Sequence, residues 1–87
     1  MIRHIVAFKL KGTPEERLEV SRRFKAALEA LPAQIDVLKS IEVGINENPA
    51  ETWDVVLTAV VETLEHVAAA SIVAPHKEAR ACVDYTF

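Results

Sequence analysis

Residues 53–62, WDVVLTAVVE, constrain the fold more than any other stretch, because they form an expected strand that is apolar on both faces. Successive side chains of a strand point to opposite sides. One side receives Trp53, Val55, Leu57, Ala59 and Val61, and the other receives Asp54, Val56, Thr58 and Val60. Covering only one side of this strand would leave a large apolar surface in water.

Three further strands are expected, at residues 2–10, 40–45 and 80–87. The first is rich in branched and aromatic residues, as strands often are. Alternation along it places Ile2, His4, Val6, Phe8 and Leu10 on one side. His4 therefore points with an apolar set, where a histidine is usually a hydrogen-bonded core residue. In the last strand, Asp84 shares a side with Cys82 and Thr86.

A helix is expected between the first two strands. Thr13 is its N-cap, Pro14 occupies the first helical position, and Glu16 completes a capping box. Pro32 stops the helix. Its apolar stripe is formed by Leu18, Phe24, Leu28 and Leu31.

A second, short helix is expected within residues 63–79, which contain a run of alanines. The element order is then β-α-β-β-α-β. This order predicts an α+β fold, a single ferredoxin-like domain over residues 1–87 with a four-stranded antiparallel sheet and both helices on one face.

The other face of that sheet has no helix to cover it. Because exposed apolar patches of this size are rare on monomers, we predict a homodimer formed sheet against sheet. A small domain of 87 residues also gains burial by self-association. The alternative is a monomer whose second face is simply apolar.

The composition argues against several classes of protein. The net charge is −3 and the basic residues are scattered, so no nucleic-acid partner is expected. No apolar run is long enough for a membrane span and no signal peptide is recognisable, so we expect no membrane partner and a cytoplasmic location. Cys82 is the only cysteine, which rules out an internal disulfide.

The order of these segments resembles the stress-responsive A/B barrel (Dabb) family of small dimeric α/β-barrel proteins. The similarity spans almost the entire chain. Its most specific pieces are the His4 strand with Phe8-Lys9-Leu10-Lys11, the segment Glu42-Val43-Gly44 and the ending Val83-Asp84-Tyr85.

The sequence departs from the family after the third strand. The family has a helix with a tyrosine and then a His-Pro-x-His turn, whereas Leu64 is followed directly by Glu65 and His66. His66 then matches the second histidine of the turn, and roughly ten residues of the helix are missing. Either these residues are left out of the printed sequence or the helix is truly shortened in the protein. We favour the first alternative, because losing most of a covering helix would expose the sheet.

The resemblance implies a ligand pocket between sheet and helices, with His4 inside it and His66 at its rim. In an antiparallel arrangement Asp84 can reach an imidazole, and a carboxylate-histidine pair suits general base catalysis. The resemblance to plant polyketide cyclases gives such a pair a role in ring closure. The candidate catalytic residues are therefore His4, His66 and Asp84. The candidate pocket residues are His4, Val6, Phe8, Phe24, Trp53 and His66.

Three functions are compatible with these residues. The favoured one is a dimeric protein that binds an unidentified small molecule. The second is a polyketide-cyclase-like or cofactor-free monooxygenase-like enzyme, with His66 as base, His4 assisting and Asp84 orienting. The third is a structural dimer without a ligand.

Other candidate residues have simpler interpretations. His76 follows Pro75 in a polar connection and is expected to be solvated. The three histidines lack the spacing of a metal site, so we predict no metal and no cofactor. Cys82 is expected to be a small core residue. Trp53 suits either a pocket mouth or an interface.

Overall fold

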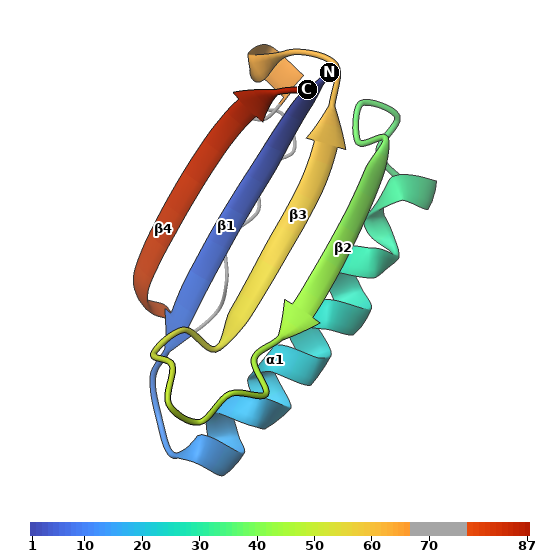
Figure 1. The fold of residues 1–87 in the computed structure, drawn as a ribbon. Helices are drawn as coiled ribbons and strands as arrows, with labels where there is room; N and C mark the ends of the chain where they lie inside the picture. Colours follow the sequence, from blue (N-terminus) through green and yellow to red (C-terminus); the bar gives the residue numbers. More distant parts are fainter. Residues whose placement is uncertain (67–76) are drawn as a thin grey trace.

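The computed structural model describes residues 1–66 and 77–87. Its elements, in chain order, are β1 (Ile2–Leu10), α1 (Pro14–Glu29), the short 3-10 helix η1 (Leu31–Ala33), β2 (Ser40–Ile45), β3 (Val55–Val61) and β4 (Lys77–Thr86). Figure 1 shows the four strands side by side, with both chain termini at the same end of the sheet. The backbone N–H of Phe87 donates to the carbonyl of Met1 at 3.2 Å.

The sheet has the strand order β2-β3-β1-β4, and every neighbouring pair is antiparallel. This confirms the predicted four-stranded antiparallel sheet. In the predicted second helix, residues 64–66 are helical and residues 67–76, which include Pro75 and His76, lie outside the described residues. Lys77 to Ala79 belong to β4, so the last strand begins three residues before the predicted start at Arg80. The cause is the length of β1, whose register with β4 continues to a pairing of Leu10 with Lys77.

α1 begins as predicted. The backbone N–H of Glu16 donates to Thr13 Oγ1 at 3.2 Å, and the N–H of Thr13 donates to Glu16 Oε1 at 3.4 Å, which completes the capping box. Gly12 has a φ of +110°, a backbone conformation that other residues rarely adopt. The chain can therefore turn sharply from β1 into the helix.

The prediction for the buried side of α1 was wrong at one position. Leu18 is 40% exposed, and the buried residues of the helix are Ser21, Phe24 and Leu28. The helix is rotated so that Phe24 meets Phe8 edge to face, with ring centroids 5.4 Å apart. Leu18 lies outside this contact.

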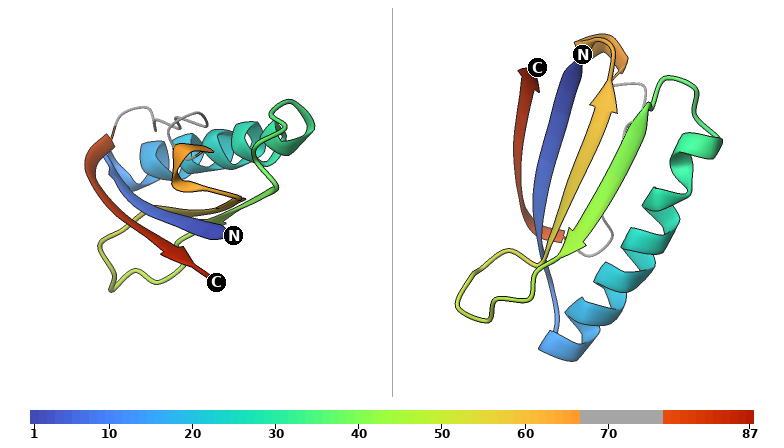
Figure 2. Two further views of the ribbon diagram at one scale, coloured as in Figure 1. Left: turned by 90° about the horizontal axis from the view of Figure 1, so that it is seen from above. Right: turned by 45° about the vertical axis from the view of Figure 1, so that its right-hand side comes forward.

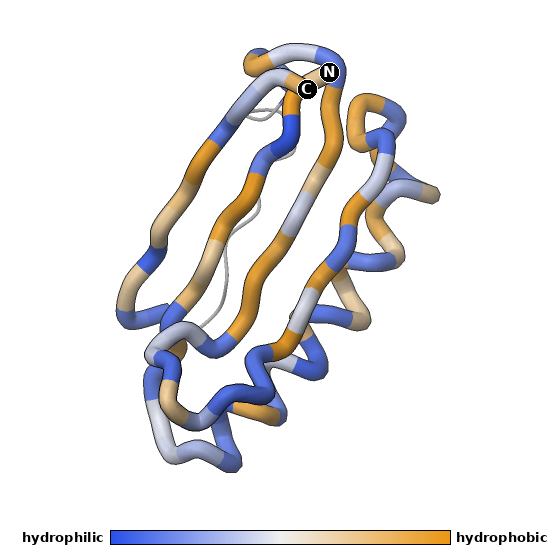
Figure 3. Tube along the Cα trace, viewed as in Figure 1, coloured by the Kyte–Doolittle hydropathy of each residue, from blue (hydrophilic) through white to orange (hydrophobic). Residues whose placement is uncertain are grey.

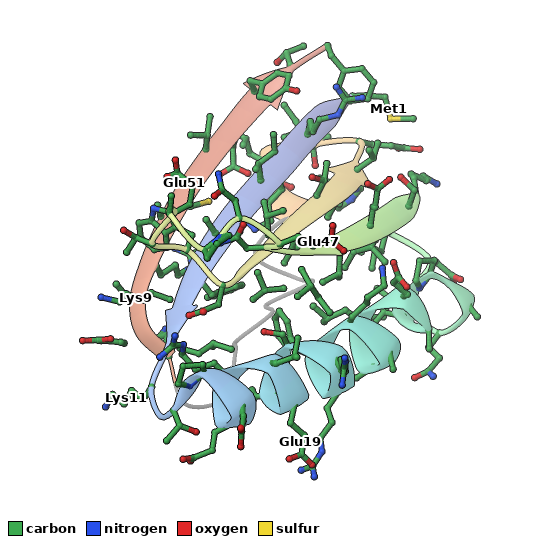
Figure 4. All side chains as sticks on the ribbon, turned by 60° about the horizontal axis from the view of Figure 1, so that its bottom comes forward. Met1, Lys9, Lys11, Glu19, Glu47 and Glu51 are labelled. Carbon is green, nitrogen blue, oxygen red and sulfur yellow. The ribbon has the colours of Figure 1, made fainter. Side chains whose placement is uncertain are left out.

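The hydrophobic core lies between α1 and one face of the sheet. Its residues come from α1, the strands β1, β2 and β3, and the segment before β2: Val6, Phe8, Leu10, Phe24, Leu28, Leu38, Val43, Val55, Leu57, Ala59 and Val61. Figure 2 shows α1 along one face of the sheet only. The charged side chains of Lys9, Lys11 and Glu19 point away from this core (Figure 4).

Asp54 ties three elements together at one end of the core. Its carboxylate accepts a hydrogen bond from the backbone N–H of Leu10 at 2.7 Å and another from Arg17 Nε at 3.1 Å. The backbone N–H of Asp54 also donates to the carbonyl of Phe8 at 3.0 Å. One carboxylate thus fixes the end of β1 and the start of β3 relative to α1.

The sheet face that α1 does not cover carries many apolar side chains, and we call it the open face. It includes the exposed residues Val56, Val83 and Tyr85 and the less exposed Ile5, Ala7 and Val60. Hydrophobic residues recur along all four strands in Figure 3. The predicted apolar character of both sides of residues 53–62 is therefore present in the fold.

No helix in the part of the chain that the structure describes is long and apolar enough to cross a membrane.

Candidate functional site

His4 and Asp84 meet on the strand pair β1 and β4. The register places them directly opposite each other, and His4 Nδ1 lies 2.5 Å from Asp84 Oδ1. An ionised carboxylate only accepts hydrogen bonds, so Nδ1 carries the proton and donates it. In the neutral ring, Nε2 then keeps a free lone pair. This contact is the one that alternation and antiparallel pairing indicate from the sequence.

His4 is among the most buried polar residues of the described chain, with 9% of its surface exposed. It lies on the same side of β1 as Val6 and Phe8, the side that faces α1 further along the strand. Asp84 is more open, with 28% of its side chain exposed. The pair therefore has a buried imidazole and a carboxylate that water reaches.

The side chain of Cys82 also contacts His4 and Asp84, and this contact was not expected from the sequence. Its Sγ lies 3.5 Å from His4 Nδ1 and 3.7 Å from Asp84 Oδ2. Cys82 is exposed and is not the small core residue that was expected, because it lies on the edge strand β4, whose ten residues are all exposed. The signal was present in the sequence, since Cys82 and Asp84 are two residues apart on one strand and share a side.

The three side chains do not form a cysteine-histidine-aspartate catalytic triad. Such a triad uses one ring nitrogen for the thiol and the other for the carboxylate. Here Cys82 and Asp84 both approach Nδ1. Burial, and then the negative charge of Asp84, raise the pKa of the Cys82 thiol, which works against a reactive thiolate.

His66 lies at the end of the sheet where β1 begins, since Val61 pairs with Ile2. Its backbone N–H donates to the carbonyl of Thr63 at 3.1 Å. Its Nδ1 is buried and has no hydrogen-bond partner among the described residues. Within that part of the chain, no hydrogen bond links His66 to His4 or Asp84, so the three predicted catalytic residues are a contacting pair and a separate histidine.

The predicted pocket residues occupy different places in the fold. Val6, Phe8 and Phe24 are buried in the core, with Phe8 fully enclosed. Trp53 lies two residues before Val55, which pairs with Phe8, whereas His4 pairs with Ala59. At the rise of a strand, Trp53 and the level of His4 are roughly 20 Å apart. The structure does not bring Trp53 to the His4 site.

Trp53 lines a separate hollow of about 340 Å³ at the end of the sheet where β2 meets β3. The hollow also includes Gly44 and Val56, and a side chain at Gly44 would press against Val56 at 3.3 Å. Val56 belongs to the open face. Trp53 therefore lies beside the open face.

A comparison with known protein families matches residues 2–87 to the stress responsive A/B barrel domain (Dabb). The chain belongs to this family. Its solved relatives include a Bacteroides fragilis protein that is 48% identical, with a TM-score of 0.84 over 99% of this chain and 95% of that one. The Bacteroides protein is described as dimeric, with a ferredoxin-like fold and unknown function. The predicted family and the ferredoxin-like fold of this Dabb chain are confirmed.

Two more distant structures share this fold. A dimeric ferredoxin-like protein of unknown function from Thermobifida fusca is 27% identical, with a TM-score of 0.71 over 99% of this chain and 90% of that one. A Dabb family protein from Mesorhizobium loti is 20% identical, with a TM-score of 0.64 over 98% of this chain and 94% of that one, and it shows the fold alone. The comparison with curated proteins finds no match.

Proposed function

We propose that this Dabb chain forms a homodimer through its open face and binds a small molecule against the other side of the sheet, next to His4. The observation that carries the proposal is the 2.5 Å hydrogen bond between His4 Nδ1 and Asp84. A buried imidazole is expensive to maintain unless its hydrogen bond stabilises the fold or takes part in recognition. Beside an apolar core, such a pair suits recognition of a ligand with one polar group.

The tautomer of His4 indicates the class of ligand. When Nδ1 of the neutral imidazole donates to Asp84, Nε2 is a hydrogen-bond acceptor. An acceptor at the edge of an apolar surface favours a largely apolar compound with a hydroxyl group, such as a phenol or an enol. A binding site of this composition, apolar with a few polar groups, is typical for small molecules.

The homodimer is supported by the open face. Val56 and Val83 are 39% and 60% exposed. They lie on β3 and β4, the two strands that flank β1, and point to the same face of the sheet. The Bacteroides and Thermobifida relatives are described as dimeric. Burying this face against a second copy removes an apolar patch that a monomer would expose.

Ligand binding is tested with a matched pair of probes, para-pentylphenol and pentylbenzene, which differ by one hydroxyl. Binding is followed by changes in the NMR signals of the uniformly labelled protein during titration. We expect the phenol to bind about two- to tenfold more tightly, the preference that one hydrogen bond provides. His4→Phe retains the ring volume and removes Nε2, so it should abolish the preference.

Two results would contradict the proposal. One is the absence of binding by either probe, which would favour a structural dimer without a ligand. The other is an unchanged preference for the phenol in His4→Phe, which would place the binding elsewhere. Arg22→Gln, a change at an exposed position of α1, is the control and should leave the preference intact.

The dimer is tested separately by size-exclusion chromatography with light scattering. Wild type should elute with the mass of two chains at micromolar concentration. Val56→Asp introduces a charge into the open face and should give monomer or aggregate. Thr52→Asp, in the exposed connection before β3, should remain dimeric. An intact Val56→Asp dimer would show that another face makes the contact.

An enzyme is the second candidate, and the same hydrogen bond favours it, because Asp84 orients His4 and stabilises an imidazolium. Incubation with linear poly-β-ketones would test this function. Ring closure that is lost in Asp84→Asn and in His66→Ala would support it. Equal product from wild type and both variants would exclude a catalytic role for the two residues.

A further inference from the structure

Three side chains of metal-binding types converge on β1 and β4. One potential ligand atom from each of His4, Cys82 and Asp84 lies within 4.8 Å of the other two. The strands place them there by register, because His4 lies opposite Asp84 and Val6 lies opposite Cys82. Neighbouring residues on two paired strands provide a fixed backbone for such a group.

The distances between these atoms resemble the edges of a tetrahedral zinc site. Bonds of about 2.3 Å to sulfur and about 2.0–2.1 Å to nitrogen or oxygen set ligand atoms roughly 3.3–3.6 Å apart. Cys82 Sγ is 3.5 Å from His4 Nδ1 and 3.7 Å from Asp84 Oδ2. The 2.5 Å contact of His4 Nδ1 is with the other carboxylate oxygen of Asp84, Oδ1, and is a hydrogen bond with the proton between the two atoms.

We propose that His4, Cys82 and Asp84 bind one divalent transition-metal ion of the zinc class, with a fourth position left for water or another ligand. Thiolate, imidazole and carboxylate are the groups that zinc binds in proteins. The ion displaces the thiol proton of Cys82, which leaves to solvent, and the proton between His4 and Asp84, which solvent exchange moves to Nε2 of the same ring, so one proton is released in total. Nδ1 becomes the metal ligand, and Nε2 then carries the ring proton.

This site does not rest on the proposed binding of a small molecule. Hydroxyl recognition uses Nε2 of the metal-free tautomer, whereas the metal uses Nδ1 and two residues that a hydroxyl need not touch. Metal binding would turn Nε2 from an acceptor into a donor. A failed phenol titration therefore leaves the metal proposal standing, and the reverse also holds.

Cobalt(II) provides a direct test, because Cys82 is the only cysteine of the chain. Any thiolate-to-cobalt charge-transfer band in the near ultraviolet must come from this residue. We expect the reduced, metal-free protein to develop this band and visible bands of tetrahedral intensity, which saturate at one cobalt per chain. Zinc should bleach both sets of bands by displacement.

Variants separate a three-ligand site from binding by the thiol alone. Cys82→Ala should lose the band, and Asp84→Asn and His4→Gln should weaken cobalt binding by more than about tenfold. Glu78→Gln removes another carboxylate of β4 and should bind cobalt like wild type. Arg80→Gln should bind somewhat more tightly, since Arg80 is a positive charge two residues from Cys82 on the same strand.

Three results would overturn the proposal. These are no charge-transfer band in wild type, a band of equal affinity in Asp84→Asn, and saturation at half a cobalt per chain, which would indicate two thiols from different copies sharing one ion. His4→Gln removes a buried residue, so its fold is checked by circular dichroism. If it does not fold, Asp84→Asn on the exposed strand decides the question.

Discussion

At the scale of single residues, two carboxylates do different work in this molecule. Asp54 holds backbone and side-chain donors of β1 and α1 in place, whereas Asp84 holds the imidazole of His4. Asp54 directly precedes β3 and Asp84 lies on β4, and 18% and 28% of their side chains are exposed. Their partners, and not their burial, separate a structural role from a candidate functional one.

Replacing Asp54 should therefore affect stability. In Asp54→Ala the N–H of Leu10 and Nε of Arg17 lose their acceptor, and we expect the free energy of unfolding to fall by about 1–3 kcal/mol. Urea denaturation measures the loss. Glu19→Gln, which breaks an exposed pair with Arg23 on α1, is the control and should change stability by less than about 1 kcal/mol. Equal effects of the two changes would contradict the anchoring role of Asp54.

Glu29 makes stability depend on pH. Hydrogen bonds from the Lys25 ammonium and then from the backbone N–H of Val43 lower the pKa of its carboxyl below the ordinary value of 4.5. The stabilising contribution of Glu29 is therefore present above pH 4.5 and is lost as the pH falls through the lowered pKa. Wild type should be more stable than Glu29→Gln at neutral pH, and the difference should shrink as the pH falls below 4.5.

Urea denaturation over this pH range checks the prediction for Glu29. Lys25→Met is the matched background, because it removes the largest cause of the lowered pKa. In that background the Glu29→Gln change should have a smaller effect. A difference between wild type and Glu29→Gln that stays constant with pH would contradict these contacts.

At the scale of elements, the rotation of α1 about its axis decides which of its apolar residues matter. Phe24 and Leu28 are buried against the sheet, and Leu18 is 40% exposed although it fits the same helical spacing. Helical spacing alone shows which residues lie on the same broad side of a helix, but not which of them face the sheet directly. The contact of Phe24 with Phe8 and the salt bridge of Arg17 with Asp54 select the orientation.

This orientation predicts unequal effects of two alanine substitutions. Phe24→Ala should lower the free energy of unfolding by about 3–5 kcal/mol, as is usual for a buried phenylalanine. Leu18→Ala should cost less than about 1 kcal/mol, since its side chain is half in water. Thermal and urea unfolding of the two variants, compared with wild type, give the values. A larger loss for Leu18→Ala would show that the helix is rotated the other way.

The sequence predicted elements and faces well, because both follow from local patterns. The capping box at Thr13, the alternation in residues 53–62 and the shared side of Cys82 and Asp84 are all consequences of spacing along the chain. Positions set by contacts between elements were harder to predict. The exposure of Cys82 depends on β4 being the edge strand, and the exposure of Leu18 depends on the packing of α1.

The same difference applies to the candidate site. Alternation and antiparallel pairing indicated that Asp84 can contact an imidazole, as it contacts His4. They did not indicate that Trp53 lies far from His4. Its distance from His4 follows from the offset between β1 and β3, where Phe8 lies opposite Val55. Register of this kind is fixed by the whole sheet and not by any one strand.

At the scale of the whole molecule, the sheet has one covered face and one open face. α1 covers the half of the sheet near β2, and β4 is exposed along its entire length. Exposed sheet edges and apolar faces are regions that proteins usually cover with another chain or element. We therefore expect folding and association to be coupled in this protein.

Coupling of this kind predicts a midpoint that depends on concentration. The denaturation midpoint of wild type should rise when the protein concentration is raised, because association stabilises only the folded chains. Val56→Asp should have a lower midpoint that does not change with concentration. Chemical denaturation at several protein concentrations, followed by circular dichroism, measures both. A wild-type midpoint independent of concentration would indicate that each copy is stable alone.

The meeting of the two chain ends has a practical consequence. Since the N–H of Phe87 donates to the carbonyl of Met1 at 3.2 Å, a few glycines are enough to join the termini into a ring. Such a ring can be reopened in the exposed connection between β2 and β3, near Asn48, to give a circular permutant with the same strand order in space. In that permutant β1 and β4 become consecutive along the chain, so His4, Cys82 and Asp84 would come from one β-hairpin.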